Sequence, residues 1–398
     1  MRSARIDRIN SLGRFAAGLF CLILYFVFAE LVLNFTTFKD IGNELDYYIA
    51  QSFTETERKD AEQFNKDLIS CGERAEIVPG TTLYKYKAAK TKSFTINSFG
   101  FRGEELTKKE RNEYRIVIFG DSKLLGYLLP DKDTIPVLVQ EKLRKHFKNK
   151  GKRINVVNFG IEAFDIQRSI EAARLYLFDL ESDFIVFYSA AVDLNEAYSL
   201  GGNDLIPFAE GDALPEIFRA RSDNNVFMLK ILQILNFAFF SDFYETESNA
   251  LENEKLGYPV PPHVIQNLND FPKSYAARIK KASDYFKAWG VPTLFILPPI
   301  PQFKNPLSEI EKKILFQREF YTPGINQFTE ECYVETIKQV EQQSDVKVVN
   351  HSEMFDGMDE TVFFDGLHMT PKANRMAAEK MAGDLIKILE SEHYLEKK

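Results

Sequence analysis

Two short segments of the chain carry the residue types of a serine nucleophile and its base. Gly120-Asp121-Ser122 follows an apolar run, and Asp365 precedes His368 by three residues ahead of a C-terminal helical pattern. A serine hydroxyl becomes an effective nucleophile when a base takes its proton, and that base needs a carboxylate to fix its tautomer and stabilise the imidazolium. Together the two segments supply the three groups of a Ser-His-Asp triad.

Each segment also has a plainer interpretation. Asp121 and Ser122 can simply cap the helix that follows them, which is a common use of both residue types. Asp365 and His368 can be polar loop residues ahead of a helix that starts at Thr370-Pro371. The triad is favoured because both segments follow predicted strands, and because none of the other four histidines has an acidic residue placed in this way beside a strand end.

The elements that must position these residues alternate between strands and helices. Short, almost wholly apolar runs separated by amphipathic stretches indicate parallel strands covered on both faces, so we expect a three-layer α/β/α sandwich with about five strands. The predicted strands are 115–119, 154–159, 184–188, 293–297 and 346–349, and the predicted helices are 136–146, 166–178, 272–289, 329–343 and 371–389. Ligands of open parallel sheets bind at the carboxyl ends of the strands, which is where both segments fall.

These two segments, and their order along the chain, resemble the catalytic motifs of the SGNH hydrolase superfamily, whose members are also called the GDSL esterases. The resemblance covers roughly residues 97–389 and also includes two other stretches. Thr95 to Gly103 is similar to the lead-in segment of membrane-anchored members, and Asn158-Phe159-Gly160 with Gln167 is similar to the second block of the family. The fold implied by the resemblance is the same three-layer, flavodoxin-like sandwich.

The resemblance also implies a role for each site residue. Ser122 would be the nucleophile, His368 the base and Asp365 its orienting acid. The backbone N–H groups of Ser122 and Gly160 would be the oxyanion donors. Arg102, in the lead-in segment, is a weaker candidate for a site residue, because a surface salt bridge would explain an arginine at this position equally well.

The chain departs from the family after the third predicted strand. Family members carry Gly-x-Asn-Asp there, and the Asn side chain is a third oxyanion donor, whereas the aligned residues here are Ala190-Ala191-Val192-Asp193. Val192 cannot donate a hydrogen bond, and losing one such donor typically costs about 10²–10³ in turnover. Gly201-Gly202-Asn203-Asp204 is an alternative position for the third block, but it lies far from the strand and has the composition of a Gly-rich loop. Asn195 is nearer but would need an irregular turn to reach the pocket.

Three functions remain open at this stage. The leading hypothesis, by resemblance, is a membrane-anchored serine esterase or O-acyltransferase that works through an acyl-Ser122 intermediate, with acetyl esters of carbohydrate as substrates. The change at Val192 motivates an alternative, a non-catalytic binding or assembly module of the cell envelope with a protein partner. A second alternative is a lipid esterase, for which the apolar stretch 226–240 would be a lid.

The N-terminal segment predicts how the chain is placed in the cell. Residues 15–35 form a 21-residue run that is apolar except for Glu30 and a few small polar residues, long enough to cross about 30 Å of hydrocarbon. A signal peptide would have a shorter apolar run, and a core helix would show polar positions at helical spacing. Four Arg and one Asp give residues 1–14 a charge of +3, so we expect a retained anchor with a cytoplasmic N-terminus and a periplasmic or extracellular domain.

The expected organisation follows from these segments. We predict a cytoplasmic tail at 1–14, a transmembrane helix at 15–35, a stalk and N-terminal extension at 36–112, and a hydrolase-like domain at 113–398 with an insertion at 198–260. Long, irregular insertions in compact α/β domains usually cover the active site.

Composition excludes several other classes of protein. The 398 residues are 45% hydrophobic and carry a net charge of −8, which indicates a globular chain. The part of the chain after residue 14 carries −11, which disfavours nucleic acid as a partner. The sequence has no phosphate loop, no dinucleotide fingerprint and no Cys or His cluster with metal-ligand spacing, so we expect no cofactor and no metal. Cys71 and Cys332 would both lie outside the cytoplasm, and whether they form a disulfide is left open.

Overall fold

The structure is a computed structural model, and it describes residues 45, 47–71, 75–81, 83–199, 262–322 and 324–395. The predicted anchor at 15–35 and the apolar stretch 226–240 lie outside these residues, as does the predicted insertion apart from its first two residues. No helix in the described part of the chain has both the length and the apolar character needed to cross a membrane.

A five-stranded parallel sheet forms the centre of the fold. Its strands are β5 (Glu113–Gly120), β6 (Arg153–Gly160), β7 (Phe184–Tyr188), β8 (Thr293–Leu297) and β9 (Val348–Asn350), in the order β6-β5-β7-β8-β9. Every residue of β5, β7 and β8 is buried, as the apolar runs predicted. The prediction of an α/β fold built on about five parallel strands is therefore confirmed.

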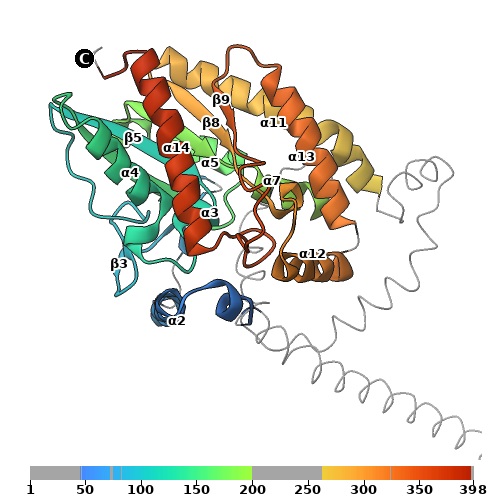
Figure 1. The fold of residues 1–398 in the computed structure, drawn as a ribbon. Coiled ribbons are helices and arrows are strands. Elements are labelled where there is room, and N and C mark those ends of the chain that lie inside the picture. Colours follow the sequence, from blue (N-terminus) through green and yellow to red (C-terminus); the bar gives the residue numbers. More distant parts are fainter. Residues whose placement is uncertain are drawn as a thin grey trace, which may run out of the picture. The chain divides into compact units, whose positions relative to one another are not determined.

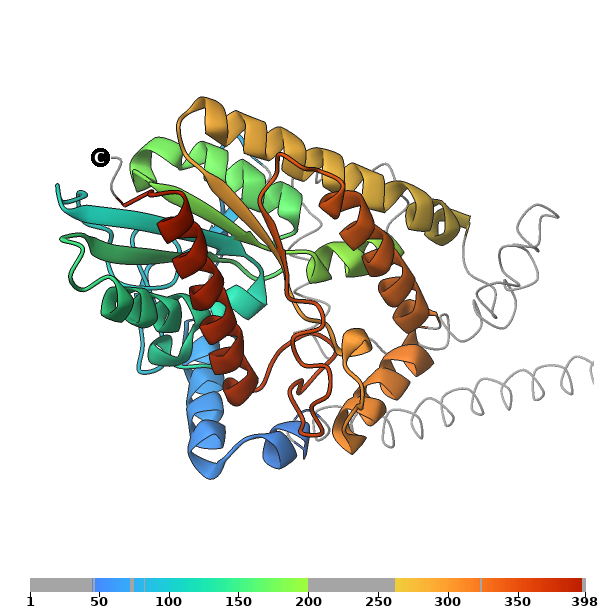
Figure 2. The same ribbon diagram turned by 45° about the horizontal axis from the view of Figure 1, so that its top comes forward.

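Helices cover both faces of this sheet (Figures 1 and 2). On one face, α4 (Ile135–His146) and α14 (Pro371–Ser391) pack on each other and on a core formed with the sheet. The other face carries α5 (Ile166–Leu175), α11 (Pro262–Ala288) and α13 (Ile325–Glu341), with α6 (Leu177–Leu180) directly after α5. Two helices at the carboxyl edge, α7 (Ala191–Ser199) and α12 (Glu309–Tyr321), were not among the predicted elements.

The segment before β5 folds onto the domain. Its described residues from 48 onward cluster with the strands and helices of the sheet in one compact unit. This segment contains α2 (Glu55–Ser70) and two small antiparallel pairs, β1 (Ala75–Ile77) with β2 (Tyr84–Tyr86) and β3 (Ala89–Lys90) with β4 (Thr95–Ile96). It stays attached because it buries its own large apolar side chains, such as Tyr48, Phe53, Phe64, Leu83 and Phe94.

Candidate active site

The turn after β5 carries the predicted nucleophile. Strand β5 ends at Gly120, and the short helix α3 (Ser122–Leu125) starts two residues later with Asp121 as its N-cap. The Asp121 carboxylate accepts the Lys123 N–H at 2.8 Å, which fixes the first turn. Gly120 is needed because a Cβ there would lie 2.5 Å from the Tyr188 carbonyl oxygen on β7. Ser122 is thereby held at the carboxyl edge of the sheet.

Ser122, His368 and Asp365 form a connected triad. Ser122 Oγ lies 2.7 Å from His368 Nε2, and His368 Nδ1 lies 2.6 Å from Asp365 Oδ2. The second carboxylate oxygen of Asp365 accepts the backbone N–H groups of Leu367 at 2.7 Å and of His368 at 2.5 Å. With Nδ1–H donating to the carboxylate, Nε2 is free to accept the serine proton, which is the arrangement that nucleophilic catalysis requires. The three side chains predicted from the sequence are thus brought together.

A tight hairpin-like loop presents the acid and the base. Phe363 and Met369 form an isolated antiparallel bridge, and Thr370 N–H donates to the Val362 carbonyl at 2.8 Å. The Thr370 side chain then caps α14, so the loop ends at a helix start as the sequence suggested. Because the loop closes on itself in this way, Asp365 and His368, three residues apart, come into contact within it.

A buried ion pair anchors the start of that loop. Glu311 on α12 accepts the N–H groups of Val362 at 2.9 Å and Phe363 at 3.1 Å through one carboxylate oxygen. Its other oxygen lies 2.7 Å from Lys304 Nζ, and both side chains are almost fully buried. Because one carboxylate ties α12 to the strand entering the triad loop, Glu311 is a positioning residue for Asp365, and the sequence analysis missed it.

Two aromatic rings flank the base. The Tyr127 ring lies 4.9 Å from the His368 ring, and the Phe364 ring lies 5.9 Å from it in a stacked arrangement. Tyr127 comes from the loop after α3, whereas Phe364 belongs to the triad loop. The imidazole is therefore restrained in the plane that points Nε2 at Ser122.

The charges of the triad favour a basic histidine. Burial disfavours the imidazolium of His368, but the charge and hydrogen bond of Asp365, with a smaller effect of Asp121, raise its pKa above the ordinary value. Burial also disfavours ionised Asp365, yet His368 and the two N–H donors outweigh it and hold the pKa of this carboxyl below its usual range. Asp365 thus stays ionised and supports proton uptake by His368.

Lys123, next to the nucleophile, is buried and not solvated. Its side chain is enclosed, and Nζ donates to the Pro299 carbonyl at 3.2 Å. Burial lowers the pKa of Lys123 to about 8, although the carboxylates of Asp121 and Asp365 act in the opposite direction. The short helix that starts at Ser122 is itself buried, so Lys123 is enclosed with it.

Gly160 does not present a free N–H group to the site. Its N–H donates to Asn158 Oδ1 at 2.9 Å, so the oxyanion donor expected at this position is already occupied. A Cβ at Gly160 would overlap the backbone of Leu125, which means that glycine is required here for the close approach of β6 and α3. The N–H of Ser122, at the first turn of α3, has no acceptor in the described part of the chain.

Ala163, in the loop after β6, has an unusual backbone conformation that the sequence analysis did not predict. Its φ is 57°, in the left-handed region that favours glycine, and the residue is exposed. Its N–H has no acceptor among the described residues. Because β6 pairs with β5 up to Gly120 and Gly160, this loop emerges at the same sheet edge as Ser122. Ala163 therefore offers, in the loop at this edge of the sheet, an N–H that has no acceptor among the described residues.

The position of the third family block holds no free amide. Val192 is 8% exposed in α7, and Asn195 accepts a hydrogen bond from Arg318 through its side-chain oxygen. Arg318 Nη1 also donates to the Gly366 carbonyl at 3.3 Å, inside the triad loop. Burial lowers the pKa of Arg318 to about 10 despite the nearby Asp365. Asn195 is thus engaged with Arg318, and residues 201–204 lie outside the described residues.

Arg102 is an internal anchor and not a surface ion pair. It is 2% exposed, and its guanidinium pairs with Asp131 at 2.7 Å. The remaining N–H groups donate to carbonyl oxygens of the loop that follows α3 and of the N-terminal extension, namely Leu125, Gly126, Leu129 and Ser93. Arg102 therefore fixes the loop that carries Tyr127.

The two cysteines that the structure describes are both free. Cys71 is partly exposed at the end of α2, and Cys332 is fully buried in α13, where burial raises its pKa far above the ordinary value. No group of three or more His, Cys, Asp or Glu side chains is placed to hold a metal ion in the described residues.

Comparison with known proteins yields structural likeness only. No family model matches the chain, and no curated protein matches it. The chain is similar to the psychrotrophic esterase EstA of Pseudoalteromonas sp. (14% identity, TM-score 0.35, covering 69% of this chain and 98% of that one). It is also similar to a GDSL-like lipase of Bacteroides thetaiotaomicron (12%, TM-score 0.35, 72% and 92%) and to the acetylxylan esterase Axe2 of Geobacillus stearothermophilus (11%, TM-score 0.36, 67% and 92%). Similarity this low carries no argument about activity, which depends on the residues of the site.

Proposed function

We propose that the chain is a serine-dependent acyl-ester enzyme that works through an acyl-Ser122 intermediate. The observation that carries the proposal is the unbroken hydrogen-bonded path from Ser122 through His368 to Asp365. Helix capping alone would not require a histidine nitrogen 2.7 Å from the Ser122 hydroxyl. Both ring nitrogens of His368 are used as a general base would use them.

The reaction follows from these contacts. Ser122 Oγ attacks the ester carbonyl carbon while its proton passes to His368 Nε2, which gives a tetrahedral intermediate with a negative oxygen. His368 then returns the proton to the leaving alkoxide, and the acyl group stays on Ser122. Water completes a hydrolysis in a second, equivalent cycle, whereas the hydroxyl of an acceptor completes a transfer.

In this proposal the negative oxygen is stabilised by backbone donors. The N–H of Ser122 is one, and the N–H of Ala163 takes the place that the sequence assigned to Gly160. The supporting observations are that both groups lack acceptors among the described residues and that both follow the carboxyl ends of adjacent strands. Val192 adds no donor, so hydrolysis is expected to be slow by about 10²–10³ compared with a site that has three donors.

The location and natural substrate extend the proposal. We place the domain outside the cytoplasm, anchored by residues 15–35, and take acyl esters of carbohydrate as the substrate class, with transfer to a sugar hydroxyl as the alternative to hydrolysis. Protease added to intact spheroplasts, or to a preparation with the outer face equally accessible, should degrade the domain. Complete protection would remove the extracytoplasmic placement without affecting the chemistry proposed for Ser122.

A binding or assembly role in the cell envelope is the competing function. It is favoured by one specific pair of observations: the missing third donor at Val192 and the engaged N–H of Gly160. A reactive phosphonate distinguishes the two functions, because it is attacked by an activated serine whatever the natural acyl group is.

The experiment compares wild type with Ser122→Ala and His368→Ala. Incubation with a fluorophosphonate and peptide mass spectrometry should locate an adduct on Ser122 in wild type and none in either variant. Turnover of an aryl acetate should fall to background in both variants while their circular dichroism stays unchanged. Absence of any adduct on wild type with several phosphonates would favour the binding role.

A further inference from the structure

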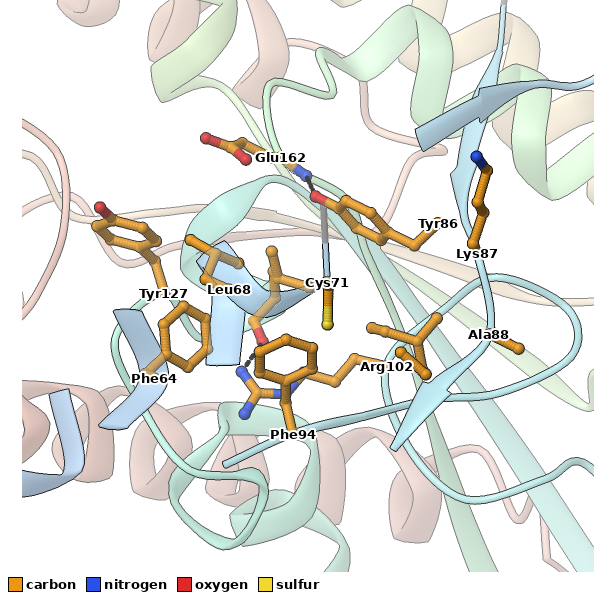
Figure 3. A pocket seen from close by; sticks show the side chains of 13 residues that line it. Phe64, Leu68, Cys71, Tyr86, Lys87, Ala88, Phe94, Arg102, Tyr127 and Glu162 are labelled. Carbon is orange, nitrogen blue, oxygen red and sulfur yellow. Dashed lines mark hydrogen bonds between the residues drawn. The ribbon is translucent and has the colours of Figure 1, made fainter. Parts of the chain in front are cut away.

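An apolar cavity lies between α2, the β2–β4 segment and the loop after α3. It has a volume of about 260 Å³, and its wall is formed mainly by aliphatic and aromatic side chains (Figure 3). The principal lining residues are Phe64, Leu68, Cys71, Tyr86, Phe94 and Tyr127. A cavity of about 150 Å³ already holds a benzene ring, so this one has room for a chain of roughly eight carbons.

One side chain is shared by the cavity and the catalytic base. The Tyr127 ring lines the cavity and contacts the His368 ring at 4.9 Å, and it also meets Phe64 at 6.0 Å. Leu125, at the end of the same short helix that begins with Ser122, contributes to the wall as well. The cavity and the catalytic base therefore share the Tyr127 ring, and part of the cavity wall belongs to the helix that begins with Ser122.

The polar groups of the wall leave the cavity without a free charge for a ligand. All five N–H groups of Arg102 have acceptors: one pairs with Asp131 and the others donate to four carbonyl oxygens. Figure 3 shows the carboxylate of Glu162 and the ammonium of Lys87 directed away from the rings, whereas the sulfur of Cys71 lies among them. A carbohydrate would find few hydrogen-bond partners here, but an alkyl chain would find continuous apolar contact.

We propose that this cavity receives the alkyl chain of the acyl group that is carried by Ser122. The proposal rests on the acyl-Ser122 chemistry proposed above, and it makes the preferred substrates esters of linear acids of about six to eight carbons. It deepens that function because it specifies the acyl group. The alkyl chain of that group would replace water along the cavity wall from Tyr127 to Phe94. It also gives the N-terminal extension a role, since α2 and β2–β4 build most of the cavity.

Chain-length preference tests the proposal in the active enzyme. The kcat/KM for p-nitrophenyl octanoate should exceed that for p-nitrophenyl acetate by about tenfold or more, because each buried methylene favours binding. Leu68→Trp, which fills the cavity, should lower this ratio by at least about tenfold. Ile69→Trp is the matched control on the same helix, since Ile69 is 80% exposed, and it should keep the wild-type ratio. A ratio unaffected by Leu68→Trp in a folded protein would overturn the proposal.

Cys71 provides a second test that needs no catalysis. In the full-length Ser122→Ala variant, methyl octanoate should slow alkylation of Cys71 by N-ethylmaleimide several-fold, whereas methyl acetate at the same concentration should not. Peptide mass spectrometry separates Cys71 from the two other cysteines. Equal alkylation rates with both esters would reject the cavity as the chain site. Protection of Cys71 without any phosphonate adduct on wild-type Ser122 would instead reject the catalytic function while keeping the binding site.

Discussion

The two halves of the candidate site are built by different means. The proton-transfer half consists of side chains, Ser122, His368 and Asp365, joined by hydrogen bonds of 2.7 Å and 2.6 Å. The oxyanion half consists of backbone N–H groups, and there the expected donor at Gly160 is engaged while Val192 brings none. Side-chain chemistry can be recognised in a sequence, but a backbone donor depends on the conformation of its loop.

The largest effect is expected in the proton-transfer half. Asp365→Asn should lower kcat by about 10⁴, because an amide at this position favours the wrong tautomer of His368 and no longer stabilises its charge. The change keeps the shape of the loop, so circular dichroism and thermal unfolding should remain close to wild type. Stopped assays with an aryl ester measure the loss.

The control for this variant is Asp359→Asn, an exposed carboxylate on the approach to the triad loop. It should retain full activity. A similar loss in both variants would mean that net charge near the loop, and not the hydrogen bond to His368, governs the rate.

The dependence of kcat/KM on pH should also depend on the proton-transfer half of the site. Because the pKa of His368 is raised, the imidazolium persists to higher pH, and only the neutral ring can accept the serine proton. We expect kcat/KM to fall about tenfold per unit on the acidic side, with a midpoint above the ordinary histidine value of about 6.5. In Asp365→Asn the midpoint should move down, since the raising charge is gone. An acidic midpoint that does not move between the two proteins would disconnect Asp365 from the base.

Much of the fold was predictable because burial on both faces makes parallel strands almost wholly apolar. The runs around Ile116, Val186 and Leu294 all became fully buried strands, and the sequence placed their ends to within a few residues. The helix α12 was missed because its apolar face is weak: Phe316 is exposed, and the helix is held by a capping box at Ser308 and by buried Glu311.

The triad could also be predicted from the sequence, whereas the residues around it could not. Asp365 and His368 lie three residues apart in one loop, so their contact is local, and only Ser122 had to be brought to them by the sheet. The burial of Arg102 and Lys123 was not predicted, because the sequence alone does not show whether a charged side chain is buried. Ala163 was overlooked because nothing in its side chain marks a positive φ.

A smaller effect is expected at Val192, where the motif of the family that the sequence resembles has an Asn. Val192 is 8% exposed, so Val192→Asn places an amide in an apolar setting and should lower the free energy of unfolding by about 1–3 kcal/mol without raising turnover. Val192→Ala separates the two causes, because it removes volume without adding a polar group. Chemical denaturation and aryl acetate turnover on the same samples measure both. A rise in turnover of about tenfold or more would show that an amide here reaches the oxyanion after all.

Two substitutions at Ala163 bear most directly on the oxyanion half. Ala163→Gly retains the N–H and removes the cost of a Cβ at φ 57°, while glycine loses more freedom on folding, so the free energy of unfolding should change by at most about 1 kcal/mol and turnover should stay the same. Ala163→Val also retains the N–H, but a β-branched residue strongly disfavours this conformation and should turn the donor away from the substrate. We therefore expect Ala163→Val to lose about 10²-fold in kcat with little change in KM. Full activity of Ala163→Val, with the altered residue confirmed by mass spectrometry, would mean that the second donor is not the N–H of Ala163.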